Sequence, residues 1–314
     1  MAKVVITEFM DAPAVAQLSA QFSVDYDPDL VDRPQDLAAW IADADAVIVR
    51  NRTQVNAALL AAGPRLRVVG RLGVGLDNID LPACAARGIT VIPATGANAR
   101  AVAEYVMGSA FVLTRGCFSA TRTVANGDWP RLAYSNGAEL HGRVMGIVGF
   151  GAIGRLVADM ARLLGMRVVA YDPALSGSDV AFAIHQAVRC DRLEELLSQS
   201  DVVSLHVPLT TGTRHLINAD RLACMKPAAV LINTARGGVV DEAALVQALQ
   251  QKRLGGAALD VFEQEPLPAG ALPTDLAQLI LTPHVAGLTR EANERVSSMI
   301  AGRVAQALNS FPEP

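Results

Sequence analysis

The chain has 314 residues, of which 51% are hydrophobic and 18% charged, and its net charge of −4 gives no basic surface for nucleic acid or an anionic membrane. This composition is that of a globular protein long enough for two domains. No apolar run approaches the ~18 residues that span a bilayer, and the start MAKVVITEFM lacks the basic stretch and apolar segment of a signal peptide.

Short apolar runs rich in β-branched residues alternate with helical patterns from the N-terminus onward. The first series predicts strands at 3–7, 46–50, 66–70 and 89–93, with a helix in the stretch DLAAWIADAD. These runs are continuous rather than alternating, as parallel strands covered on both faces require. The first part of the chain is therefore predicted to form βαβ units.

A long helical pattern at 98–115 and a polar loop around 125–137 mark the best candidate for a domain boundary. A second series of strands is predicted beyond it, at 143–150, 167–172, 201–207, 229–235, 256–262 and 279–283. A last helical pattern at 293–309 follows, and we expect it to fold back onto the first domain. The fold class is thus α/β, with doubly wound parallel sheets.

The stretch VGFGAIG contains the glycine spacing G-x-G-x-x-G at Gly149, Gly151 and Gly154, between a predicted strand and a predicted helix. In a dinucleotide-binding turn, the first glycine makes the turn, the second admits the pyrophosphate and the third lets helix and strand pack closely. The helix start at Ala152 and Ile153 offers free N–H groups to phosphate. A tight turn without a ligand is the alternative reading of the glycines alone.

Asp172 ends the next predicted strand, 18 residues after Gly154. A carboxylate at this point accepts hydrogen bonds from the ribose hydroxyls of the adenosine and repels a 2′-phosphate. The following residues, DPALSG, include no Arg or Lys that could bind such a phosphate. The sequence therefore predicts NAD rather than NADP as the cofactor.

Three ionisable residues follow strands of the second series: Arg236 after LINTA, Glu265 after ALDVF and His284 after LIL. Ligands collect at the carboxyl ends of the strands in an open α/β sheet, so these side chains can converge on one site. An arginine holds a carboxylate by two-point contact, and a histidine backed by a carboxylate can donate or accept a proton. Each could instead be an ordinary surface or loop residue, and His206, also at a strand end, is the main competitor of His284.

The segments GIVGFGAIG, NTARGGVVDE, ALDVFEQEP and LTPHVAG occur in an order and at spacings that resemble the D-isomer-specific 2-hydroxyacid dehydrogenase family. The resemblance covers essentially the whole chain. It implies that Arg236 orients the substrate, that His284 is the general acid/base and that Glu265 is its partner. It also implies that the N–H groups of Val74 and Gly75 meet the substrate carboxylate.

The resemblance further implies the rest of the cofactor site and the domain organisation. It places Thr234, Ala235 and Asp260 near the nicotinamide and Val207 and Thr213 on the adenosine side, and Gly287 is a further predicted cofactor-binding residue. It implies a flavodoxin-like substrate domain of 1–97 plus 288–314, into which a Rossmann NAD-binding domain of 98–287 is inserted, with substrate and NAD meeting in the cleft between them. A homodimer is implied, with 98–140 contributing, and the apolar pattern at 101–113 is long for burial within one domain.

The predicted function is an NAD-dependent transfer of hydride between nicotinamide and a small anionic 2-keto or 2-hydroxy acid, D-specific by the resemblance. Arg50, at the end of a strand, either reads a second anionic group of the substrate or forms an ion pair within its own domain. A corepressor that binds NAD, or a phosphite- or formate-type dehydrogenase, is the alternative function.

Cellular location is predicted from the cysteines. Cys84, Cys117, Cys190 and Cys224 are dispersed and form no C-x-x-C pair. Such single thiols favour a reducing cytoplasm over a disulfide framework or a zinc site, so we expect no metal.

Overall fold

The computed structural model describes residues 1–311, and the chain divides into two compact units. Unit 1 consists of Met1–Asn98 and the chain from Leu288 onward, and unit 2 of Ala99–Gly287. Each unit is built around its own sheet, in which all paired strands are parallel. Two parallel sheets confirm the predicted α/β class. Within the described residues, no helix combines the length and the apolar character needed to cross a bilayer.

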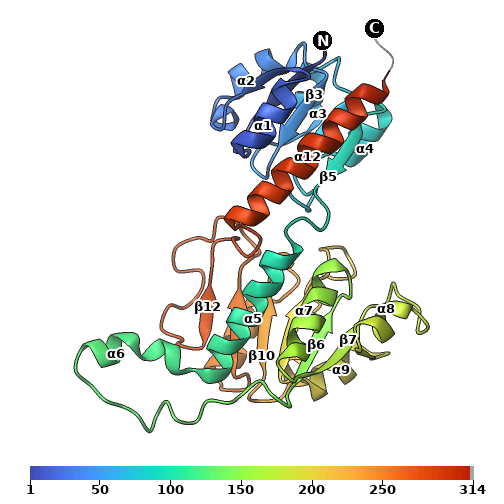
Figure 1. The fold of residues 1–314 in the computed structure, drawn as a ribbon. Helices are drawn as coiled ribbons and strands as arrows, with labels where there is room; N and C mark the ends of the chain where they lie inside the picture. The colour runs from blue at the N-terminus through green and yellow to red at the C-terminus, as the bar shows by residue number, and fades with distance from the viewer. Residues whose placement is uncertain (312–314) are drawn as a thin grey trace. The chain divides into compact units, whose positions relative to one another are not determined.

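The sheet of unit 1 has the strand order β2-β1-β3-β4-β5 (Figure 1). Its strands are β1 (Lys3–Ile6), β2 (Ser23–Tyr26), β3 (Ala46–Val49), β4 (Val68–Arg71) and β5 (Thr90–Pro93). Its helices are α1 (Ala12–Ser19), the 3-10 helix η1 (Leu30–Asp32), α2 (Pro34–Ile41), α3 (Ala57–Ala62), α4 (Leu81–Ala86) and α12 (Arg290–Ser310).

The sheet of unit 2 has the order β12-β11-β10-β9-β6-β7-β8. Its strands are β6 (Val144–Val148), β7 (Arg167–Tyr171), β8 (Val188–Arg189), β9 (Val202–Leu205), β10 (Val230–Asn233), β11 (Gly256–Leu259) and β12 (Leu279–Leu281). Its helices are α5 (Ala99–Arg115), the 3-10 helix η2 (Cys117–Ala120), α6 (Thr121–Ala125), α7 (Ala152–Leu163), α8 (Val180–Ile184), α9 (Leu193–Gln199), α10 (Ala219–Ala223) and α11 (Glu242–Gln250). β6 and β9 are adjacent in the sheet although 53 residues lie between them in sequence. The chain therefore reverses its direction of winding between these two strands.

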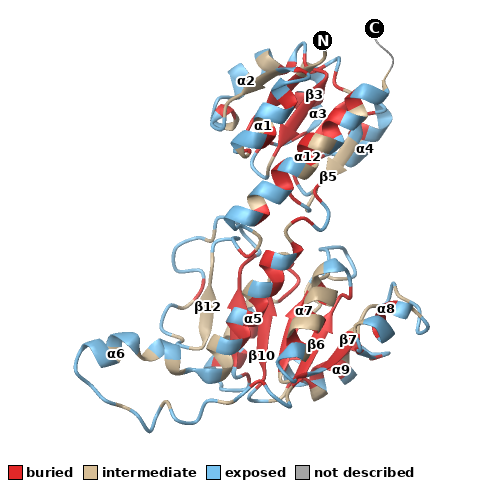
Figure 2. Ribbon diagram, in the orientation of Figure 1, coloured by how far each residue is buried: buried red, intermediate tan, exposed pale blue. Residues whose placement is uncertain are grey.

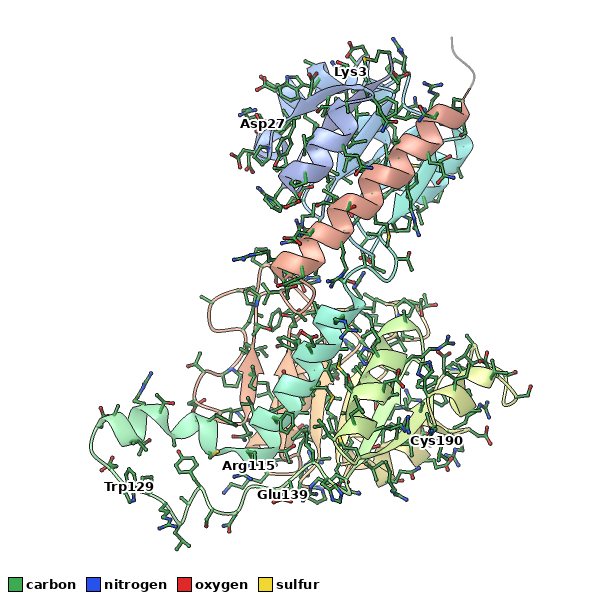
Figure 3. All side chains as sticks on the ribbon, in the orientation of Figure 1. Lys3, Asp27, Arg115, Trp129, Glu139 and Cys190 are labelled. Carbon is green, nitrogen blue, oxygen red and sulfur yellow. The ribbon has the colours of Figure 1, made fainter. Side chains whose placement is uncertain are left out.

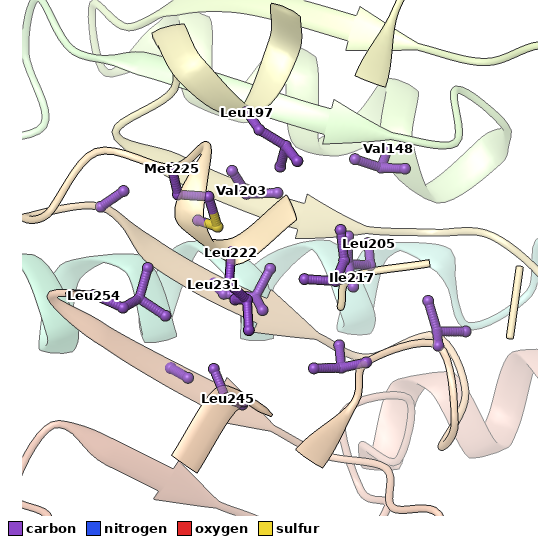
Figure 4. Packing of buried hydrophobic residues seen from close by; sticks show 14 of the residues in the cluster. Val148, Leu197, Val203, Leu205, Ile217, Leu222, Met225, Leu231, Leu245 and Leu254 are labelled. Atoms are coloured by element: carbon purple, nitrogen blue, oxygen red, sulfur yellow. The ribbon is translucent and has the colours of Figure 1, made fainter. Parts of the chain in front are cut away.

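Both sheets are covered on two faces, because successive side chains of a strand point to opposite sides. In unit 1, Val4 and Ile6 pack with Ile300 of α12, whereas Val5 packs on the other face with Ile41. Figure 2 shows the central strands buried and the outer faces of the helices exposed. In unit 2, one face is a dense cluster in which Val203, Leu205 and Leu231 lie among the residues in Figure 4. This two-sided cover explains the continuous apolar runs.

The helix α5 buries one face within unit 2. Ala103, Val106 and Ala110 belong to the same core cluster as Val157 of α7, and α5 lies beside α7 in Figure 1. The apolar pattern at 101–113 is therefore covered in part inside this unit, while Phe111 of the same pattern is 41% exposed.

Candidate active site

The glycine turn after β6 has the geometry that a pyrophosphate requires. Gly149 has φ of 92°, the left-handed conformation that favours glycine. A Cβ on Gly154 would collide with the carbonyl oxygen of Gly149, while a Cβ on Gly151 would meet nothing within 4 Å. No side chain caps the N-terminus of α7 at Gly151, so no capping side chain occupies the first-turn N–H groups of Ala152 and Ile153. This start of α7 fits an anionic group.

Asp172 lies directly beyond β7 and anchors the same turn. One of its carboxylate oxygens accepts from the backbone N–H of Phe150 at 2.8 Å, and the other accepts from that of Ala174 at 2.9 Å. A basic residue lies near this loop although it is distant in sequence. The Nη1 of Arg189, on β8, lies 3.5 Å from where a Cβ of Gly177 would stand. The guanidinium of Arg189 is paired with Asp191, so its charge is already neutralised.

Val207 and Thr213, predicted on the adenosine side, follow β9. The Val207 side chain lies 3.0 Å from where a Cβ of Gly149 would stand, against the glycine turn. Thr213 folds the next loop back on itself, because its hydroxyl donates to the carbonyl of Pro208 at 2.6 Å and accepts from the N–H of Thr210 at 2.7 Å.

The turn after β10 presents Thr234, Ala235 and Arg236. The Asn233 side chain holds the turn from both ends, since its Oδ1 accepts from the N–H of Ala235 and its Nδ2 donates to the carbonyl of Arg236, both at 3.0 Å. The Arg236 Nη1 donates to the carbonyl of Ala235 at 2.6 Å. The hydroxyl oxygen of Thr234 is buried and, within residues 1–311, has no hydrogen-bond partner. This free hydroxyl at a strand end fits a polar group supplied by a bound ligand.

Gly237 brings this turn against the loop after β11. A Cβ at Gly237 would overlap the carbonyl oxygen of Phe262, so only glycine allows the two loops to approach so closely. The second loop carries Glu265, whose Oε1 accepts from the N–H of Phe262 at 3.0 Å.

Glu265 and His284 form the predicted pair. The Oε2 of Glu265 lies 2.8 Å from the Nδ1 of His284, and 47% of the His284 side chain is exposed. Because a carboxylate only accepts hydrogen bonds, Nδ1 must carry a proton in this pair. The other ring nitrogen, Nε2, is then the atom that can give or take a proton at a substrate.

Asp260 supports the loop that carries His284. Its buried carboxylate accepts from the N–H of Val285 and from the N–H of Ala286, each at 2.8 Å. The loop ends at Gly287, the last residue of unit 2. Asp260 was predicted beside the nicotinamide, and the structure adds this supporting role, for which the sequence gives no signal.

The other histidines differ from His284. Burial lowers the pKa of His206 to about 3, and its Nε2 lies 2.9 Å from the hydroxyl of Ser204, so this ring stays neutral at physiological pH. His215 lies 3.2 Å from Glu263, and His185 lies 2.9 Å from Asp159. Sequence reasoning missed these two histidine–carboxylate pairs, because their partners are distant in sequence.

In unit 1, Arg50 follows β3 and is partly buried. Its Nη2 donates to the Oδ1 of Asn293 at 2.6 Å and its Nη1 to the carbonyl of Phe9 at 3.4 Å. Burial lowers the pKa of Arg50, and the nearby charge of Glu8 raises it. Both hydrogen-bond partners are neutral, which differs from the ion pair considered as an alternative. The neighbouring Arg52, in contrast, pairs with Asp32.

The loop that carries Arg50 is fixed by a buried carboxylate. Glu8 accepts from the backbone N–H of Arg50 at 2.9 Å, of Arg52 at 3.1 Å and of Thr53 at 3.0 Å. Burial alone would raise the pKa of Glu8, but these backbone donors outweigh it and lower the pKa. Asn78 ties this loop to the one after β4, because its Nδ2 donates to the carbonyl of Thr53 at 2.7 Å.

The loop after β4 carries Val74 and Gly75, the residues expected to meet the substrate carboxylate. The Val74 side chain is exposed. The loop returns to the body of the unit at Asn78, whose carbonyl accepts from the N–H of Val55 at 2.8 Å.

A glycine turn at the start of α7, a Thr234 hydroxyl without a partner among residues 1–311 and an imidazole–carboxylate pair fit a dehydrogenase that uses a dinucleotide. Residues 107–286 match the family model described as D-isomer specific 2-hydroxyacid dehydrogenase, NAD binding domain. The chain belongs to the D-isomer specific 2-hydroxyacid dehydrogenase family. It is an NAD-dependent oxidoreductase that acts on small anionic 2-hydroxy or 2-keto acids.

Named relatives cover nearly the whole chain. The (S)-sulfolactate dehydrogenase of Chromohalobacter salexigens is 51% identical over 308 residues, which are 98% of this chain and 99% of that protein. The D-3-phosphoglycerate dehydrogenase of a Synechocystis species is 37% identical over 99% of this chain, but the chain spans only 55% of its length. The D-lactate dehydrogenase of Aquifex aeolicus, solved with NAD and lactic acid, has a TM-score of 0.82 at 31% identity, covering 98% of this chain and 95% of that one. These relatives give no support to a corepressor or to a phosphite- or formate-type dehydrogenase.

Proposed function

We propose that this enzyme interconverts a three-carbon 2-keto acid and its 2-hydroxy acid, and that the substrate carries a second anionic group on C3. Sulfopyruvate and sulfolactate are the first candidates. The observation that carries the proposal is Arg50, a partly buried guanidinium at a strand end whose hydrogen-bond partners are neutral. A partly buried guanidinium whose hydrogen bonds within residues 1–311 go to neutral atoms is suited to an anionic ligand.

The 51% identity with a sulfolactate dehydrogenase over nearly the full length of both chains supports this choice. Stereochemistry is consistent with it. Sulfur outranks oxygen in the priority rules, so (S)-sulfolactate has the same spatial arrangement at C2 as D-lactate. One face of hydride transfer therefore serves a D-specific family and an (S)-sulfolactate product alike.

Each site residue has a proposed role in reduction of the keto acid. The N–H groups of Val74 and Gly75 bind the carboxylate, Arg50 binds the distal anion, and Arg236 orients the substrate and polarises the carbonyl. Bound NADH supplies the hydride that reaches C2. The Nε2 of His284 donates a proton to the forming alkoxide, and Glu265 holds Nδ1 and stabilises the imidazolium.

The same proposal assigns the units and the cofactor contacts. Unit 1 is the substrate domain. The start of α7 binds the pyrophosphate, Asp172 binds the adenosine ribose, Val207 and Thr213 lie on the adenosine side, and Thr234, Ala235, Asp260 and Gly287 line the nicotinamide end. The orphaned Thr234 hydroxyl and the open space at Gly151 support this assignment.

A substrate panel tests the proposed substrate class. NADH oxidation is measured with sulfopyruvate, phosphohydroxypyruvate, hydroxypyruvate, glyoxylate and pyruvate. We expect kcat/KM to be highest for sulfopyruvate and at least tenfold lower for the three acids without a second anion, because a charge-assisted contact is worth about 1.5–3 kcal/mol. Comparable kcat/KM values for sulfopyruvate and glyoxylate would contradict the proposal.

Coenzyme choice gives a second prediction. Replacing Asp172 with asparagine keeps a hydrogen-bond acceptor for the turn but removes the charge that opposes a 2′-phosphate. Two like charges 4 Å apart repel by about 1 kcal/mol even in bulk water, so the ratio of kcat/KM for NADPH to that for NADH should rise about fivefold. The ratio is measured from initial rates with both coenzymes. A wild-type enzyme that prefers NADPH would overturn this interpretation of Asp172.

We also propose a homodimer that pairs through the arm of η2, α6 and the following loop. This arm extends away from the sheet of unit 2 in Figure 1, and Figure 3 shows Trp129 on its loop. Its large apolar side chains are exposed: Phe118 by 59%, Trp129 by 78% and Leu132 by 82%. Apolar side chains gathered on one projecting segment are typical of an interaction surface.

Light scattering at micromolar concentration should give twice the mass of one chain. Trp129→Glu should shift the equilibrium toward the monomer, because it places a charge where apolar contact is expected. Leu163→Glu is the matched control, since Leu163 is 88% exposed but lies on α7. A wild-type protein with the mass of one chain would exclude the dimer.

We propose a cytoplasmic location because the four cysteines are dispersed along the chain. The structure leaves Cys84, Cys117, Cys190 and Cys224 as free thiols, which suits a reducing compartment. Cell fractionation that recovers the enzyme with periplasmic or secreted markers would contradict this.

A further inference from the structure

The backbone of His284 has a conformation that needs support. Its φ is 55°, in the left-handed region that non-glycine residues adopt at a cost of about 1–2 kcal/mol. The N–H of His284 donates to the carbonyl of Asp260 at 2.8 Å. The next two N–H groups, of Val285 and Ala286, donate to the carboxylate of the same residue. Asp260 therefore holds the backbone on which the proposed acid/base sits.

A chain of hydrogen bonds continues from Asp260 to a helix. The hydroxyl of Thr282 donates to the Oδ1 of Asp260 at 2.6 Å. The hydroxyl of Tyr105, on α5, lies 2.6 Å from the same Thr282 oxygen. Tyr105 and Thr282 are 177 residues apart in sequence, and Tyr105 is half-buried. The chain thus connects α5 to the loop of His284.

The direction of these bonds follows from the number of protons available. Thr282 has one hydroxyl proton, and it is used in the bond to the Asp260 carboxylate. Tyr105 must therefore donate to Thr282. Burial raises the pKa of Tyr105, so the phenol keeps its proton throughout the neutral range. A donor that points at Thr282 favours the rotamer in which Thr282 donates to Asp260, and bonds in such a chain polarise one another.

From this geometry we infer that Tyr105 is a positioning residue for the proton transfer at His284, acting through Thr282 and Asp260. In this role Tyr105 touches neither substrate nor cofactor. The chain Tyr105–Thr282–Asp260 keeps the loop 282–286 in the one arrangement that directs Nδ1 of His284 toward Glu265. The inference rests on the proposed role of His284 and adds the helix α5 to the catalytic framework.

The test is a double-mutant cycle on Tyr105 and Thr282. Tyr105→Phe removes the hydroxyl and keeps the ring, and Thr282→Val removes the other hydroxyl at nearly constant volume. We expect each to lower kcat for keto-acid reduction about three- to tenfold while the Kd of NADH stays within twofold. The double variant should be no slower than Thr282→Val alone, because Tyr105 acts only through Thr282.

The pH profile separates positioning from general destabilisation. Weaker alignment of His284 with Glu265 destabilises the imidazolium, so the alkaline limb of kcat/KM for reduction should move to lower pH in both single variants. Tyr26→Phe is the control, since the Tyr26 hydroxyl also donates a hydrogen bond, to the backbone carbonyl of Met10 at 3.3 Å, but lies in unit 1. It should change neither kcat nor the profile.

Two results would overturn the inference. One is wild-type kcat and an unmoved alkaline limb in Tyr105→Phe, and the other is additive losses in the double variant. If His284→Ala itself kept wild-type turnover, the proposed function would fail instead, and the two failures are therefore distinguishable.

Discussion

Replacing His284 with alanine should lower kcat for keto-acid reduction by roughly a thousandfold, while the Kd of NADH changes less than twofold. General acid–base catalysis contributes about 10²–10⁴-fold, and the structure gives this histidine the required setting. Its Nδ1 is engaged by Glu265 at 2.8 Å, which leaves Nε2 to exchange a proton. Steady-state rates give kcat, and quenching of protein fluorescence gives the Kd of NADH.

The chain offers a matched control for this experiment. His185 and Asp159 form another imidazole–carboxylate pair in unit 2, at 2.9 Å. Asp159 lies on α7, and His185 directly follows α8. His185→Ala removes a comparable pair that lies outside the loops after β10, β11 and β12 and should keep wild-type kcat. Inactivation by His206→Ala together with full activity of His284→Ala would refute the assignment, because His206 would then be the acid.

Glu265→Gln refines the same prediction and should be milder. The amide can still hold the ring by a hydrogen bond, but it no longer stabilises the positive charge, so the imidazolium gives up its proton at lower pH. Reduction needs the protonated ring, and its activity falls as pH rises. The alkaline limb of kcat/KM should therefore move to lower pH, and the acidic limb of hydroxy-acid oxidation, which needs the neutral ring, should move the same way.

The fold followed from sequence wherever strands are buried on both faces. The runs that became β3 and β6 are entirely buried, and they read as continuous apolar segments. The strands β2 and β8 were missed. Both lie at a sheet edge, where one side is open, β2 carries Asp25 and β8 has only two residues. Edge position alone does not hide a strand, since β5 and β12 also lie at sheet edges and were predicted. What β2 and β8 lack is an apolar run long enough to indicate a strand.

The catalytic pair could be predicted because the carboxyl ends of parallel strands share one edge. His284 and Glu265 follow neighbouring strands β12 and β11, so their proximity is a consequence of topology. The contacts of Tyr105 and Glu8 could not be found in this way. Tyr105 reaches Thr282 only because α5 packs on the sheet, and Glu8 meets the loop after β3 only through the register of β1 with β3. Neither contact has a sequence pattern, since each depends on tertiary packing.

Arg50→Ala should lower kcat/KM for sulfopyruvate by ten- to a hundredfold and change that for glyoxylate less than twofold. A charge-assisted hydrogen bond to the distal anion contributes about 1.5–3 kcal/mol, which corresponds to this range. Glyoxylate has no distal group and cannot lose the contact. The measurement is kcat/KM for both substrates in both enzymes, and the ratio of the two losses is the decisive quantity.

Arg50→Ala also has a second effect, on the packing of unit 1, and the experiment must distinguish it from a loss of substrate binding. Arg50 also bonds Asn293 of α12 at 2.6 Å and the carbonyl of Phe9 at 3.4 Å, so the alanine variant loses contacts within unit 1 as well. Asn293→Ala breaks the first of these contacts and keeps the guanidinium. If Arg50 reads the distal anion, Asn293→Ala should leave the preference for sulfopyruvate over glyoxylate within about threefold of wild type, because the charge is still present. If Arg50 serves only the packing of α12, both variants should weaken both substrates equally and lower the thermal stability in parallel. A substrate-selective loss in Arg50→Ala alone is the result that assigns this arginine to the substrate.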